Sequence, residues 1–111
     1  MQRDMKDVLE KAKIIISEEV EKEGFKVKQI FLFGSRARGD FNKESDWDFF
    51  VVLDRDISFQ QLKKIVGRIQ LRLVEEGIPS DVILRGENQF NEARKSVGNL
   101  SYYVAQEGIL I

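Results

Sequence analysis

Two runs of seven mostly apolar residues, 27–33 and 47–53, constrain the fold of this chain more than any other feature. The first run, Val-Lys-Gln-Ile-Phe-Leu-Phe, begins by alternating and ends fully apolar, whereas the second, Trp-Asp-Phe-Phe-Val-Val-Leu, is apolar almost throughout. Each run is much shorter than the roughly 20 residues that a membrane-spanning helix needs. Both runs therefore predict buried β-strands.

Segments with helical periodicity lie around these strands. Apolar side chains recur at helical spacing over residues 4–23 and again over 56–76, which predicts two amphipathic helices. Ser58 and Gln61 fit a capping box at the start of the second helix, and Gly77 fits its end. Four smaller elements are expected: a short helix at 35–38, a strand at 80–84, a helix over 88–106 broken near Gly98, and a short strand or apolar extension at 108–111.

This order of elements predicts one layer of β-sheet covered by helices, an α+β (α/β sandwich-like) fold. The 111 residues have the size of one ordinary domain, so residues 1–111 are expected to form a single domain. That length leaves little room for a second lobe that would hold an acceptor substrate.

The composition excludes several kinds of chemistry. The sequence has no cysteine and no histidine, which rules out disulfides, zinc sites with Cys or His ligands, and Ser-His or Cys-His nucleophilic catalysis. Its net charge of −1 argues against direct nucleic-acid binding, because such proteins are normally basic. No apolar run is long enough for a membrane span, and the charged N-terminus lacks a signal-peptide segment, so a cytoplasmic location is expected.

A candidate site lies between the two apolar runs. Gly34 and Ser35 follow the first strand, and ten residues separate Ser35 from Asp46, which precedes Asp48 by two positions. Residues two apart in a strand share a face, so the two carboxylates would repel each other unless a divalent cation bound between them. Glycine at a strand end allows close backbone approach to a ligand, and a helix start with a serine hydroxyl can hold phosphate. Taken alone, each piece has a plainer explanation as a solvated strand start or a capped turn.

Three further residues complete this candidate site. Asp81 begins the third strand and could complete a metal site or accept a proton from an attacking hydroxyl. Arg36 and Arg38 lie in the loop and could neutralise a triphosphate, although solvated loop arginines would need no such role. Each of these residue types is common alone, whereas the ordered set of strand, Gly-Ser, Asp-x-Asp, strand, helix and a third aspartate is not.

On these residues the chain resembles the nucleotidyltransferase superfamily that includes the DNA polymerase beta catalytic core, and in particular its minimal members. The resemblance implies a mixed β-sheet backed by helices, with the site on its open face. It implies that Asp46, Asp48 and Asp81 are catalytic and bind metal, with two Mg²⁺ ions expected. It further implies that Gly34 and Ser35 hold the triphosphate of ATP, with Arg36 and Arg38 as the neighbouring cations.

The implied reaction moves AMP from ATP onto an acceptor hydroxyl and releases pyrophosphate. Minimal members resemble antitoxins that pair with helical HEPN proteins, so a tyrosine of a HEPN toxin is the expected acceptor. Two alternatives stay open: an antitoxin that neutralises its partner by occlusion without catalysis, and transfer to a small molecule such as an antibiotic. A homodimer could supply the cleft that the last alternative needs.

Overall fold

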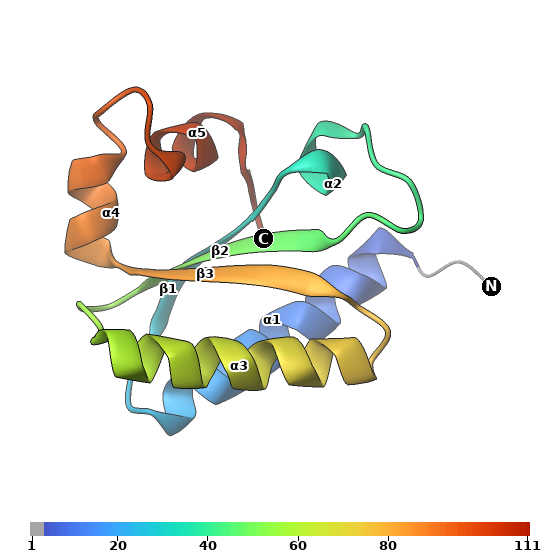
Figure 1. The fold of residues 1–111 in the computed structure, drawn as a ribbon, viewed down its shortest axis with the longest axis horizontal. Helices are drawn as coiled ribbons and strands as arrows, with labels where there is room; N and C mark the ends of the chain where they lie inside the picture. Colours follow the sequence, from blue (N-terminus) through green and yellow to red (C-terminus); the bar gives the residue numbers. More distant parts are fainter. Residues whose placement is uncertain (1–3) are drawn as a thin grey trace.

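The computed structural model describes residues 4–111 as four helices longer than one turn, a one-turn helix and a four-stranded sheet (Figure 1). In chain order the elements are α1 (Met5–Lys22), β1 (Val27–Phe33), α2 (Ser35–Arg38), β2 (Trp47–Leu53), α3 (Phe59–Glu75), β3 (Ser80–Gly86), α4 (Glu87–Ala93), α5 (Leu100–Glu107) and β4 (Ile109–Leu110).

The sheet is mixed and has the strand order β3-β2-β1-β4. β1 is antiparallel to β2 and to the short β4, whereas β2 and β3 are parallel. A parallel pair needs a crossover connection, which α3 supplies. The α+β fold with a mixed sheet is therefore confirmed.

Helices cover the two faces of the sheet unequally (Figure 1). α1 and α3 lie along one face and bury most of the core against alternate strand residues, including Leu32, Phe49 and Leu84. A smaller cluster, built on Phe50 and Phe90, lies between the opposite face and the helices α4 and α5. Because α4 and α5 are short, this second face stays partly open, and we call it the open face.

The helices α1 and α3 are also joined by a buried carboxylate. The Glu19 side chain is 2% exposed, and its Oε2 accepts hydrogen bonds from Lys22 Nζ and from Arg72 Nη1, each at 2.8 Å. These bonds lower the pKa of Glu19, the Lys22 bond most strongly, although burial acts in the opposite direction.

Within the described residues, no helix is long and apolar enough to cross a membrane.

Most expected elements are confirmed, with three differences at their ends. The second long helix begins at Phe59 rather than at residue 56, because Ser58 caps it by accepting from the Gln61 N–H at 3.2 Å. β3 continues to Gly86, since it pairs with the whole length of β2. The last helical region is two helices, and the break spans residues 94–99 rather than one glycine.

Candidate active site

Gly34 makes the sharp turn between β1 and α2. Its φ of 74° and ψ of −157° lie in a region that is essentially restricted to glycine. The missing side chain also matters, because a Cβ at this position would lie 3.1 Å from Asp48 Cγ and closer still to Oδ2. The turn therefore brings the backbone directly against a carboxylate of β2, a contact that sequence reasoning did not predict.

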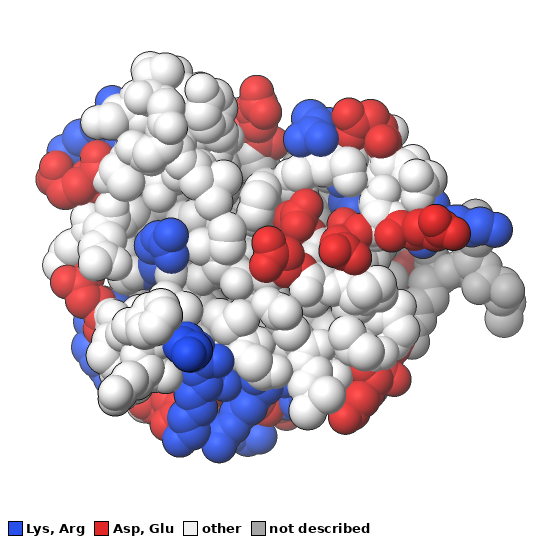
Figure 2. Space-filling model, in the orientation of Figure 1, with Lys and Arg blue, Asp and Glu red and all other residues white. Residues whose placement is uncertain are grey.

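The sheet register places two of the three predicted carboxylates side by side. Asp48 is the direct partner of Phe33 in the antiparallel pair and of Asp81 in the parallel pair. Asp48 and Asp81 lie on the open face, since their neighbours two positions along the strands, Phe50 and Ile83, pack in the smaller cluster. Figure 2 shows acidic side chains gathered on this face, where β2 and β3 begin.

Asp48 carries the electrostatic signature of a crowded acidic site. Partial burial raises the pKa of its carboxyl, the charges of Asp81 and then of Asp46 raise it further, and Arg38 lowers it. Of these neighbours, Asp81 is the direct register partner of Asp48, and Asp46 lies two positions before Asp48 in the chain. The sheet thus brings together Asp48 and Asp81, whereas the roles of Asp46, Arg36 and Arg38 at this site stay predictions.

The carboxylate oxygens of the site are suitable ligands for a divalent cation, although the side chains do not form a complete coordination site. Within residues 4–111, no group of three or more carboxylate, imidazole or thiol side chains is arranged to hold a metal ion. Magnesium, however, is usually held by one or two carboxylates together with waters and the phosphates of a substrate. Asp48 and Asp81 offer such oxygen ligands. A cation there would offset the burial and then the repulsion from Asp81, which together raise the Asp48 pKa.

Ser35 and Arg38 form the two ends of α2, the one-turn helix beside the carboxylates. The Ser35 carbonyl accepts from the N–H of Gly39, which closes the helix with a left-handed residue at φ 88°. Arg38 is exposed, and its Nε donates to Asp40 Oδ2 at 3.3 Å. Binding of nucleotide by Gly34, Ser35 and Arg38 stays a prediction, and their placement beside Asp48 is compatible with it.

Arg36 has partners inside the chain that sequence reasoning did not predict. Its Nε and Nη2 both donate to the carbonyl oxygen of Ser45, at 3.3 and 2.9 Å. The guanidinium also lies over the rings of Phe41 and Trp47. One signal for this arrangement was present in the sequence, since Phe41 is a lone aromatic residue in the polar segment 39–46.

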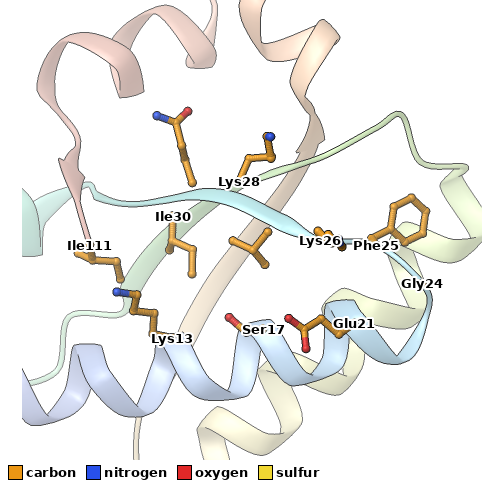
Figure 3. A pocket seen from close by; sticks show the side chains of 11 residues that line it. Lys13, Ser17, Glu21, Gly24, Phe25, Lys26, Lys28, Ile30 and Ile111 are labelled. Carbon is orange, nitrogen blue, oxygen red and sulfur yellow. The ribbon is translucent and has the colours of Figure 1, made fainter.

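The clearest surface hollow lies elsewhere. A hollow of about 650 Å³ opens between α1 and the beginning of β1 (Figure 3). Lys13, Ser17 and Glu21 of α1 line one side, and residues 24–30 line the other, at the opposite end of β1 from Gly34. None of the residues that line this hollow belongs to the acidic site.

Comparison with known proteins identifies the family of the chain. The fold and the carboxylates define the chain as a small α+β domain with an acidic site at one end of a mixed sheet. Residues 9–104 match the nucleotidyltransferase domain family, and the chain belongs to this family.

Two relatives come from Methanocaldococcus jannaschii. "Putative protein adenylyltransferase MJ1379" is 32% identical over 103 residues, which are 91% of this chain and 95% of the relative. "Putative protein adenylyltransferase MJ0604" is 34% identical over 67 residues, which are 60% of this chain and 62% of the relative. The second match therefore spans less than two thirds of that relative's length.

Two solved structures share the fold. A crystal structure of a toxin–antitoxin with AMP-PNP aligns with a TM-score of 0.56 at 17% identity, covering 87% of this chain and 69% of that one. A mutant of the toxin–antitoxin MntA–HpeT, in which two aspartates two positions apart are replaced by glutamate, aligns with a TM-score of 0.55 at 18% identity. That alignment covers 91% of this chain and 69% of the other.

Proposed function

We propose that this protein is a magnesium-dependent adenylyltransferase that moves AMP from ATP onto a hydroxyl of a partner protein. The observation that carries the proposal is the register of the sheet, which sets Asp48 beside Asp81 and against the Gly34 turn. Carboxylates so placed can hold Mg²⁺, through which a triphosphate would bind.

Each residue then has a part in one displacement. Asp46 and Asp48 would hold Mg²⁺, which supplies charge stabilisation at the reacting phosphate when it is bound. Asp81 would contribute to that site and receive the proton of the acceptor hydroxyl. The acceptor oxygen forms a bond to the α-phosphorus, the bond from that phosphorus to the α,β-bridging oxygen breaks, and pyrophosphate leaves with the bonding electrons. Gly34, Ser35 and Arg38 would hold the departing phosphates.

A protein acceptor is favoured over a small molecule. The relative that aligns over nearly its whole length is named as a protein adenylyltransferase, and both structural neighbours are toxin–antitoxin proteins, one of them with AMP-PNP. These likenesses support a toxin protein as the acceptor, and we propose that the modified residue is a tyrosine of a HEPN-type toxin.

The proposal is tested by label transfer. The chain is incubated with ATP labelled at the α-phosphate, Mg²⁺ and the protein encoded beside it, and the same reaction is run with Asp48→Asn and with EDTA. We expect label in the partner that both changes abolish, and mass spectrometry should place the added AMP on a tyrosine. A different result would overturn catalysis in favour of occlusion: the folded wild-type chain labels no acceptor, and it neutralises its partner as well as Asp48→Asn does.

A further inference from the structure

Arg36 connects the Gly34 turn to the segment that carries the first aspartate of the site. Its Cζ lies 4.5 Å from the centre of the Phe41 ring and 4.4 Å from the Trp47 ring. Two of its donors meet the single carbonyl of Ser45, the residue directly before Asp46. A planar guanidinium can stack on rings and donate two hydrogen bonds at the same time, which an ammonium group cannot do.

The contact with Trp47 extends this connection to the third strand. The Trp47 side chain is buried in the larger core, and its backbone N–H donates to the Pro79 carbonyl at 2.9 Å. Pro79 lies two residues before Asp81. Through Arg36 and Trp47, the turn at Gly34, the Asp46 segment and the start of β3 are therefore held to one another.

The loop between α2 and β2 has mostly local bonds of its own. The Asn42 N–H donates to Ser45 Oγ at 3.1 Å, and the Glu44 N–H donates to Asn42 Oδ1 at 2.8 Å. These bonds shape the loop without tying it to the sheet. The Phe41 ring is 39% exposed and meets the Arg36 guanidinium, so the arginine gives this apolar side chain a fixed partner.

We propose that Arg36 is a positioning residue, which fixes Asp46 and Asp48 relative to the Gly34 turn rather than binding the triphosphate directly. Its consequences for cation binding and catalysis rest on the proposed function, but its effect on the order of the loop does not. Residues that orient metal ligands from behind typically change metal affinity by about 10–100-fold when they are replaced.

The test compares Arg36→Gln, Arg36→Lys and Phe41→Ala with the wild-type chain. Hydrogen exchange of residues 41–48 reports on loop order, and Mn²⁺ binding followed by electron paramagnetic resonance reports on the aspartates, both without ATP or acceptor. The matched control is Arg55→Gln, since Arg55 also stacks on a ring, that of Phe25 at 4.3 Å, and donates to a carbonyl, that of Gly24 at 2.7 Å. Arg55 follows the far end of β2.

We expect Arg36→Gln to speed exchange of residues 41–48 and to weaken Mn²⁺ binding about tenfold or more. Phe41→Ala should change both in the same direction by a few fold, although Phe41 carries no charge, and Arg36→Lys should not restore wild-type values. The control should leave both unchanged. In a transfer assay, Arg36→Gln should raise the Mg²⁺ concentration needed for half-maximal rate.

Direct phosphate binding by Arg36 would give a different pattern. Phe41→Ala would then match the wild type in hydrogen exchange and in Mn²⁺ affinity. Arg36→Lys would keep most of the ATP affinity, because it keeps the charge. That pattern overturns the proposal. Phe41→Ala removes only a partly exposed ring, so it decides the matter even if Arg36→Gln fails to fold. A wild-type chain that transfers no AMP would count against the proposed function alone, since hydrogen exchange needs neither metal nor substrate.

Discussion

Replacing Gly34 with alanine should damage the fold and the site together. Gly34 has a φ of 74° with ψ −157°, and an alanine held there costs about 1–3 kcal/mol of stability. The new Cβ would also overlap the Asp48 carboxylate, which must turn away from its preferred rotamer at about 0.5–1.5 kcal/mol. Together these terms predict a loss of about 1.5–4.5 kcal/mol in the free energy of unfolding.

Gly77→Ala is the matched control. Gly77 has nearly the same φ, 75°, but a Cβ there meets nothing within 4 Å, so only the left-handed backbone costs energy, about 1–2 kcal/mol. Urea unfolding measures both losses, and Mn²⁺ binding should be lost in Gly34→Ala and kept in Gly77→Ala. The reasoning fails if the two variants are equally stable and both bind Mn²⁺ as the wild type does.

Two further predictions concern buried or crowded carboxylates. The pKa of Asp48 is raised in the folded state, so the metal-free protein loses stability as pH rises through that pKa. The variant Asp48→Asn should show a weaker dependence of stability on pH and should be more stable at neutral pH. It should also lose the rise in melting temperature that Mg²⁺ gives the wild type. Unfolding curves from about pH 4 to 7 would contradict this if the slopes of the two proteins were the same. Glu19→Ala should lower the free energy of unfolding by about 1.5–3 kcal/mol, because it removes a buried acceptor of two charged hydrogen bonds. Glu18 also pairs with Arg72 but is 53% exposed, so Glu18→Ala should change the free energy of unfolding by no more than about 0.5 kcal/mol. The pKa of Glu19 is lowered, so its contribution is present at neutral pH and is lost as pH falls through that lowered value; equal losses in the two variants would refute the assignment.

Local patterns carry the parts of the fold that the sequence predicts well. Apolar periodicity identifies the long helices, the short apolar runs identify β1 and β2, and Gly34 and Gly77 mark turns that need a positive φ. The predicted break near Gly98 is narrower than the observed connection at residues 94–99. A single glycine signals a helix end but not the length of the connection around it.

Pairwise contacts account for what sequence reasoning could not supply. That Asp48 lies directly beside Asp81 depends on the parallel register of two strands separated by a helix, which no local pattern specifies. The contacts of Arg36 with Ser45 and two rings depend on how an irregular loop folds back. A loop arginine near a suspected phosphate site is therefore ambiguous in sequence, and its side-chain partners decide what it contacts.

The parallel pairing of β2 with β3 also has a consequence for the order in which the chain folds. β1 and β2 can close through the segment between them, which brings Gly34 to Asp48. Asp81 arrives only after α3 has crossed the sheet, and such non-local pairing is intrinsically slow. This pairing presses one carboxylate toward another, so we expect a divalent cation to speed the docking of β3 onto β2 during refolding.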